Sequence, residues 1–414
     1  MERSYESARA LVSEAEGPLS PYLEAFVSSL IEQRYSAWCV YLKAYRAADF
    51  SGWLALQVTD TRDVDERAIA RYHRERSRGR RRPWRNELYA LHQLLTFLRG
   101  GGVIDDPAAA AAVVPADHLV HRFEAHLHHV RGLATRTISV YAAFARQFLI
   151  ARFGSGAVDL HGLCAADAIE FVQRTAQRLG PRRLKLAITA LRSFLGHAQM
   201  LGEVTSGIAA AVPAVSVWST TPALPRAIDA EHARLAIDAC DRRTAVGRRD
   251  RAVLLLLARL GLRSGEVAAL MLDDVDWDAG RLRVFGKGAR EALLPLPADV
   301  AQAIAGYLQH GRPIADDRHL FLRARAPICG FKNSAVAVGS IVMHALARAG
   351  VDAPHKGAHQ FRHALATQML RNGASLAEIG ELLRHRSPQS TALYARVDLV
   401  ALRALALAWP GGAR

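Results

Sequence analysis

Residues 359–394 gather side chains that together suit chemistry at a phosphate ester. The stretch holds His359, Arg362, His385 and Tyr394, with two short apolar helical patterns between them. An arginine offers a planar fork of donors to a phosphate, and a histidine exchanges a proton near neutral pH. A tyrosine hydroxyl can serve as a nucleophile in covalent catalysis. Each residue alone is more often structural, but the set indicates attack on a phosphodiester without a metal.

Helix-start signals predict how this stretch is folded. Ser375 and Glu378 have the S-x-x-E spacing of a capping box, so a helix should begin there. Ser387 followed by Pro388 is typical of an N-cap and a first helical proline. We therefore expect Tyr394 on the next short helix, about two turns from its start.

These residues carry a resemblance to a known family. H-x-x-R-H at 359–363, Arg384-His385 and Tyr394 nine residues later resemble the C-terminal box of tyrosine recombinases, the phage-integrase family. GLRSGE at 261–266 is similar to the upstream arginine context of that family. Lys287, within RLRVFGKGAREALLPL, fits the lysine that the family places on a hairpin between the two boxes.

The resemblance implies site-specific DNA recombination through a 3′-phosphotyrosine link. Tyr394 would attack the scissile phosphate and release a 5′-hydroxyl, while Arg263 and Arg362 would clamp the non-bridging oxygens. Lys287 would protonate the leaving oxygen, and His359 would exchange a proton with the tyrosine or the phosphate. The implied catalytic residues are Arg263, Lys287, His359, Arg362, His385 and Tyr394. Because the phosphotyrosine conserves the bond energy, no ATP and no other cofactor is expected.

Three further positions bear on this site. His385 would hydrogen-bond the phosphate, and Glu266 is expected to brace Arg263 rather than touch DNA. Phe361 stands where the family commonly has leucine, and Arg384 where it commonly has glycine. Neither departure removes a catalytic group, and Arg384 could add a phosphate contact.

The composition indicates a polyanionic partner. The chain has 414 residues, a formal net charge of +15 and 50% hydrophobic residues. Such an excess of positive charge favours nucleic acid over a membrane, although charge alone leaves an RNA-binding protein open. The four cysteines are scattered without a C-x-x-C. They argue against a zinc site or a disulfide framework and fit a reducing compartment.

Membrane and metal sites are not expected. The N-terminus lacks the apolar core of a signal peptide, and no uncharged apolar run reaches the roughly 18 residues of a spanning helix. We expect a bacterial cytoplasmic, nucleoid-associated protein. DVDWD at 274–278 starts like a calcium loop, but Ala279 and Phe285 replace the required glycine and glutamate. Histidines recur every four residues from His355 to His363, without the glutamate of an H-E-x-x-H zinc motif.

Periodicity and punctuation predict a mainly α protein with a small β-sheet near residues 273–296. We expect helical core-binding modules, of the SAM-like kind in this family, followed by a mixed α/β catalytic domain. The expected divisions are an N-terminal helical DNA-binding module at 1–112, a core-binding domain at 113–205, a linker at 206–226, and a catalytic domain with a C-terminal tail helix at 227–414.

A faint internal repeat suggests that the first module duplicates the second. At offsets of 97 or 98, the apolar residues Phe26, Leu30, Tyr35, Val40 and Phe50 match Phe123, Leu127, Leu133, Ile138 and Phe148. Ala90-Leu91 and Leu94-Leu95 match Ala190-Leu191 and Phe194-Leu195 at offset 100. The extra first copy is not part of the minimal family pattern.

Clustered cations mark candidate DNA contacts. Residues 71–85 contain eight arginines in fifteen positions, a density that suits phosphate contact or, alternatively, a solvated basic face. The residues that we predict to contact DNA are Arg78, Arg80, Arg81, Arg82, Arg85, Arg136, Arg182, Arg183, Lys185, Arg192 and Arg384.

Alternatives remain open at this stage. A type IB topoisomerase-like enzyme shares the tyrosine–arginine chemistry, a catalytically idle DNA-binding accessory protein needs none of it, and an RNA-binding protein is more distant. The two helical modules favour recombination, for integration or excision of a mobile element. The expected partners are double-stranded DNA at specific recombination sites, further copies in a synaptic homotetramer, and accessory DNA-bending or sister recombinase proteins. An apolar helix at 398–409 would dock on a neighbouring copy or fold back in cis.

Overall fold

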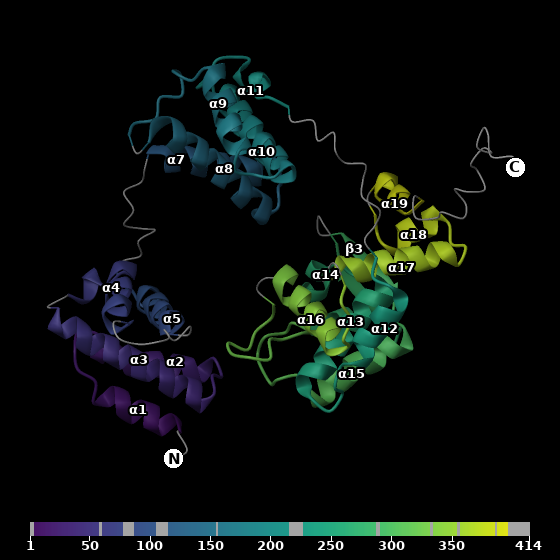
Figure 1. The fold of residues 1–414 in the computed structure, drawn as a ribbon, viewed down its shortest axis with the longest axis horizontal. Helices are drawn as coiled ribbons and strands as arrows, with labels where there is room; N and C mark the ends of the chain where they lie inside the picture. The colour runs from purple at the N-terminus through teal and green to yellow at the C-terminus, as the bar shows by residue number, and fades with distance from the viewer. Residues whose placement is uncertain are drawn as a thin grey trace, which may run out of the picture. The chain divides into compact units, whose positions relative to one another are not determined.

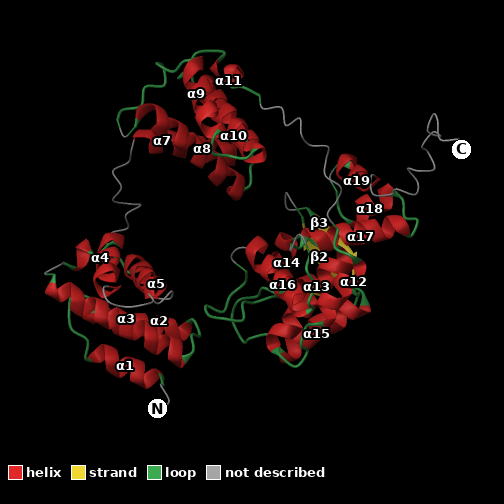
Figure 2. Ribbon diagram, in the orientation of Figure 1, coloured by secondary structure: helices red, strands yellow, loops and turns green. Residues whose placement is uncertain are grey.

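The computed structural model is largely helical, with one small antiparallel sheet, which confirms the predicted fold class (Figure 1, Figure 2). The residues that it describes are 4–57, 60–77, 87–104, 115–154, 156–214, 227–286, 290–331, 334–353, 357–385 and 387–395. Two compact units emerge, Asp105–Thr221 and the combination of Met1–Ile104 with Pro222–Arg414. Among the described residues, no helix combines the length and apolar character needed to cross a membrane.

The N-terminal helices, called here the first bundle, enclose an aromatic core. The Phe50 ring packs edge-on against Tyr72, with the ring centroids 5.1 Å apart. Ser36 begins the longest helix by accepting a hydrogen bond from the Cys39 amide. The elements of this bundle are α1 (Tyr5–Ser13), α2 (Ser20–Glu32), α3 (Ala37–Leu56), η1 (Thr61–Asp63), α4 (Glu66–Ser77) and α5 (Glu87–Gly100).

The following helices, called here the second bundle, have a separate core. Phe123 and Phe148 each pack edge-on against another phenylalanine, with centroids 5.4 Å from Phe194 and Phe171 respectively. Pro181 begins the long α10, where its fixed φ suits the first helical position. The elements of this bundle are α7 (Pro115–His129), α8 (Thr135–Phe153), α9 (Ala165–Ala176), α10 (Pro181–Met200) and α11 (Ile208–Ala211).

The C-terminal region, residues 227–395, is built around α13 (Ala245–Leu260). The apolar run Leu254–Leu257 is fully buried, and α13 packs on α15, α16 and α17. Asp229 caps α12, the helix before α13, by accepting a hydrogen bond from the Glu231 amide at 2.8 Å. The other helices of this region are α12 (Ala230–Asp238), α14 (Ser264–Ala269), η2 (Leu272–Asp274), α15 (Ala298–His310), α16 (Ser334–Arg348), α17 (His359–Arg371), α18 (Leu376–Leu382) and α19 (Pro388–Ala395).

The sheet pairs β1 (Val275–Asp276), β2 (Arg281–Phe285) and β3 (Glu291–Pro295) in sequence order. Burial alternates along β2, where Leu282 and Val284 face the core, as the strand pattern predicts. The Gly286 amide donates to the Arg290 carbonyl at 2.8 Å, which continues the β2–β3 pairing one residue beyond each strand.

Local signals in the sequence set the ends of the elements that surround the site. Gly261 adopts a left-handed φ of 57° and ends α13, which brings the chain into α14. The capping box predicted for α18 is confirmed. The Ser375 hydroxyl accepts from the Glu378 amide at 3.2 Å, and the Glu378 carboxylate accepts from the Ser375 amide at 2.7 Å. Tyr394 lies near the end of α19, as predicted.

Candidate active site

The structure brings together the predicted catalytic residues that lie within its described parts. They come from the start of α14, from α17, from the turn after α18 and from α19; the last three helices pack together (Figure 1). Ring centroids are 6.3 Å apart for His385 and Tyr394 and 5.7 Å apart for His363 and Tyr394. The residues that meet here are Arg263, His359, Arg362, His385 and Tyr394.

Glu266 holds two arginines at the edge of the site. Its carboxylate accepts from the Arg263 amide at 2.9 Å and from the Arg263 guanidinium at 2.6 Å, which is the bracing role expected for it. It also accepts from Arg384 at 2.8 Å. Burial acts to raise the pKa of Glu266, but the Arg263 hydrogen bonds and the Arg384 charge outweigh it and lower the pKa. Arg384 therefore lies against Glu266 in this structure.

Arg362 is buried at the centre of the C-terminal region, with 3% of its surface exposed. Its guanidinium donates to the carbonyls of Gly261 and Leu383, which end α13 and follow α18. Burial, with the nearby charge of Arg263, lowers the pKa of Arg362 to about 10, so the group stays charged at neutral pH. Since a guanidinium has five N–H donors, others remain for an anion.

Tyr394 is 1% exposed and its hydroxyl is hydrogen-bonded to a histidine that the sequence interpretation had given no catalytic role. The Tyr394 Oη atom lies 2.9 Å from His363 Nδ1. Burial raises the pKa of Tyr394, despite the opposing charges of Arg362 and Arg263. A residue at i+4 from His359 shares its helix face, and that spacing was the available signal for His363.

The histidines around Tyr394 are held neutral. Burial, followed by the charges of Arg362 and Arg263, lowers the pKa of His385 to about 4. Burial also lowers the pKa of His359 and of His363. The His385 Nδ1 atom lies 2.8 Å from the Thr391 hydroxyl, on the same helix as Tyr394. At neutral pH these imidazoles can therefore accept a proton.

The arrangement suits transfer of a phosphoryl group to a tyrosine. Arg263 and Arg362 supply positive charge for a developing anion, and the charge of the buried Arg362 acts away from bulk water, where it interacts strongly. His363 supplies a neutral acceptor next to the hydroxyl of Tyr394. A phosphodiester placed between the arginines and the tyrosine would meet a nucleophile, a base and an oxyanion site.

Five residues that were predicted to contact DNA lie outside the site, on the second bundle. Arg136, on α8, and Arg182 and Arg183, on α10, line one groove between these helices. Lys185 is exposed on α10. Arg192 donates to the Val212 carbonyl at 2.6 Å and so ties α10 to the segment after α11.

Other predicted residues lie outside the described parts of the chain. Among them is Lys287, between β2 and β3. The arginines between α4 and α5 that were predicted to contact DNA also lie outside the described residues. They are Arg78, Arg80, Arg81, Arg82 and Arg85.

Comparison with known proteins gives a consistent result. The model of the phage integrase family matches residues 226–399. A Sinorhizobium fredii protein, y4rA, named as an integrase/recombinase, is 46% identical over 412 residues, which cover 98% of each chain. The tyrosine recombinase XerC of Pelobacter propionicus is 31% identical over 291 residues, covering 69% of this chain and 92% of XerC.

The fold is shared with a solved structure. The XerH site-specific recombinase, crystallised in a post-cleavage complex with its palindromic difH substrate, aligns with a TM-score of 0.53 and 19% identity. The alignment covers 70% of this chain and 84% of that chain.

Proposed function

The chain belongs to the phage integrase family of tyrosine recombinases, and from that premise we propose that it cuts and rejoins DNA at specific sites through a 3′-phosphotyrosine. The observation that carries the proposal is the hydrogen bond between Tyr394 and His363 beside the buried Arg362 and the partly exposed Arg263. The site thus holds a nucleophile with a proton acceptor and an anion-binding pair.

In the proposed reaction, the Tyr394 oxygen attacks the scissile phosphorus and its proton passes to Nδ1 of His363. The bond between phosphorus and the 5′-oxygen breaks, and that oxygen takes a proton from Lys287. Arg263 and Arg362 stabilise the charge on the non-bridging oxygens in the transition state. Attack by a 5′-hydroxyl on the phosphotyrosine reverses these steps and joins a new strand, without ATP.

His359 and His385 have supporting roles in this proposal. Both are neutral at physiological pH, because burial and the neighbouring arginines disfavour their charged forms. A neutral ring can donate one N–H to a phosphate oxygen while its other nitrogen accepts a hydrogen bond. The contact between His385 Nδ1 and Thr391 fixes that ring beside Tyr394.

We assign the second bundle as the core-binding domain, with DNA along the groove between α8 and α10. This groove of about 610 Å³ is lined by Arg136, Arg182 and Arg183, and by no carboxylate. Gln147 adds a side chain that can donate and accept. Cations around an apolar floor suit a phosphate backbone.

The enzyme works, in this proposal, as a homotetramer on paired recombination sites of a mobile element. Accessory DNA-bending or sister recombinase proteins are further proposed partners. The C-terminal tail at 396–414, which lies outside the described residues, carries Leu402, Leu405 and Leu407 to a neighbouring protomer. Burial of such an apolar segment between copies would link each tyrosine to the next one.

A nicked substrate tests the function directly. Cleavage close to the nick, on the nicked strand, releases a short fragment that carries the 5′-hydroxyl, so the phosphotyrosine cannot be resealed and the protein stays attached to labelled DNA. Covalent capture by the wild-type protein, with a site-dependent yield, supports a recombinase. Efficient relaxation of supercoiled plasmids of any sequence would instead support a topoisomerase, and binding without capture would support an idle accessory protein.

A further inference from the structure

We infer that the first bundle is a second copy of the core-binding fold, and that its α3–α5 face is a second site for duplex DNA. This inference rests on the proposed function for its ligand. The duplication itself rests on helix positions, turn geometry and core residues.

The helices of the two bundles follow the same order at a nearly constant offset. Helices α3 and α8 begin at Ala37 and Thr135, 98 residues apart. Helices α4 and α9 begin at Glu66 and Ala165, 99 residues apart, and both have 12 residues. Two unrelated helical bundles would not be expected to keep both order and spacing.

The turns that end corresponding helices match in their backbone hydrogen bonds. After α5, the Val103 amide donates to the Leu98 carbonyl at 2.9 Å, around Gly102 with φ 67°. After α10, the Glu203 amide donates to the Ala198 carbonyl at 3.0 Å, around Gly202 with φ 74°. These are the same bonds, 100 residues apart, and both form the six-residue closure of a Schellman motif.

A second turn shows the same correspondence with a different residue. Between α2 and α3, Arg34 adopts a φ of 61°, and between α7 and α8 Gly132 adopts a φ of 56°. Left-handed backbone is uncommon for a residue other than glycine, so its occurrence in Arg34 shows that the turn is imposed by the surrounding fold. The core positions agree as well, since Phe50 and Phe148 are both buried at the same offset.

The charges, in contrast, are placed differently on the two copies. In the second bundle, two of the groove arginines stand at the start of α10. In the first bundle, the cations of the α3–α5 face are Lys43 and Arg46 in α3, and Arg34 precedes that helix. The fold is therefore repeated while the cationic pattern has moved, which suits contact with a different stretch of DNA.

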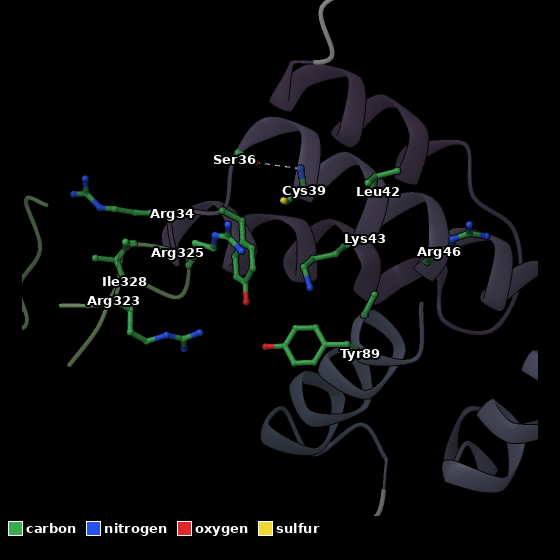
Figure 3. A pocket seen from close by; sticks show the side chains of 14 residues that line it. Arg34, Ser36, Cys39, Leu42, Lys43, Arg46, Tyr89, Arg323, Arg325 and Ile328 are labelled. Carbon is green, nitrogen blue, oxygen red and sulfur yellow. Dashed lines mark hydrogen bonds between the residues drawn. The ribbon is translucent and has the colours of Figure 1, made fainter. Parts of the chain in front are cut away.

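Aromatic side chains accompany these cations. Lys43 Nζ lies 4.6 Å from the Tyr89 ring centroid and 4.8 Å from the Tyr35 ring centroid. Tyr89 is 54% exposed, and Trp38 and Tyr45 are also exposed. Figure 3 shows Lys43 of α3 and Tyr89 of α5 at one cavity, whose lining also includes Arg323, Arg325 and Ile328 of the C-terminal region and includes no carboxylate.

The charge of this face points to duplex DNA as the occupant. A cationic face without carboxylates suits a phosphate backbone, and an exposed tyrosine suits sugar and base edges.

The test compares two charge-matched variants of the full-length protein. Lys43→Gln/Arg46→Gln removes two cations from the α3–α5 face. Arg9→Gln/Arg62→Gln removes two exposed cations of the same bundle that do not line this face. Affinity for a long duplex carrying the site is measured against salt concentration, together with the length of the nuclease footprint.

The Lys43/Arg46 variant should lose about 1.8 from the slope of log affinity against log salt, as expected for two phosphate contacts. Its footprint should shorten on one flank, while the footprint of the control variant stays unchanged. Equal loss in both variants, or no loss in either, overturns the inference. Tyr89→Ala provides a second measure that leaves the charge intact, since it should weaken binding without changing the salt slope.

A nicked duplex that carries only the core site tests the proposed recombinase function separately from the second DNA site. All variants should form the covalent complex on it as the wild type does, because the flank is missing. If the wild-type protein fails to form that complex, the proposed function fails. If the wild type succeeds but the footprints of all variants are equal, only the second site is wrong.

Discussion

Nδ1 of His363 lies 2.9 Å from the hydroxyl oxygen of Tyr394, across the interface between α17 and α19. Both side chains are largely buried, and burial lowers the pKa of the histidine while it raises that of the tyrosine. In the resting protein the proton therefore stays on the phenol, and the imidazole is ready to accept it. Cleavage should depend on this histidine more directly than on His359.

Replacing His363 should slow the chemical step. In His363→Ala the phenol loses its proton acceptor, and the cleavage rate in a single turnover should fall about 100-fold or more. DNA affinity should change little. The matched control is His344→Ala, an exposed histidine on α16 that should keep the wild-type rate. A larger loss from His359→Ala than from His363→Ala would return the role of base to His359.

Tyr394→Phe should abolish the covalent complex and leave binding to the site nearly intact. Only one oxygen is removed, and the ring continues to fill its buried position. The loss of one hydrogen bond should cost about 1 kcal/mol of folding stability. The readouts are denaturing gels for attached protein and a mobility shift for binding. Persistent cleavage by the phenylalanine variant would mean that another nucleophile acts.

Substitutions of the two arginines should distinguish an effect on the cleavage step from an effect on folding stability. Arg263 is partly exposed and bonded to Glu266 alone among the described side chains, so Arg263→Ala should remove roughly 3 kcal/mol of transition-state stabilisation while the protein stays folded. Arg362 ties two carbonyls inside the protein, so Arg362→Ala should also lower the melting temperature of the C-terminal region. Cleavage rates and thermal unfolding measured on both variants check this; similar melting temperatures would contradict it.

Acid should destabilise the C-terminal region through the partly buried His385. The pKa of His385 is lowered to about 4 in the folded protein, whereas an unfolded histidine titrates near 6.5. Between these values the unfolded chain binds more protons, so stability falls as the pH drops from about 6.5 toward about 4. Urea unfolding at several pH values should show a shallower fall for His385→Asn than for the wild type. Parallel curves for the two proteins would show that His385 does not contribute.

The sequence predicted the parts of this site that depend on local rules. Capping chemistry placed the start of α18 at Ser375 and Glu378, and proline placement put Tyr394 on α19. The strands of the small sheet were predicted from the alternation of apolar and polar residues near 273–296. Each of these features depends on residues a few positions apart, so they can be read without knowing how distant elements pack.

The features that could not be predicted from the sequence are contacts between elements that are far apart in the chain. His363 was visible as part of a helical motif, but the pattern could not say which imidazole on α17 meets Tyr394. Arg384 donates to Glu266, 118 residues earlier, a contact that the sequence pattern did not show, and its predicted DNA contact stays a prediction. Its left-handed φ of 53° helps to turn the chain after α18, and no short-range signal revealed that geometry.

The burial of Arg362 bears on how activity can be lost in evolution. Because this guanidinium holds the ends of two helical segments together, a descendant that no longer cuts DNA would still be selected to keep it for folding. His363 and the hydroxyl of Tyr394 hold less of the structure than the Arg362 guanidinium, so they can be lost once cleavage is dispensable, although the buried Tyr394 ring is still needed for packing. Among related genes, the arginine then reports an intact scaffold, and the tyrosine–histidine pair reports a working enzyme.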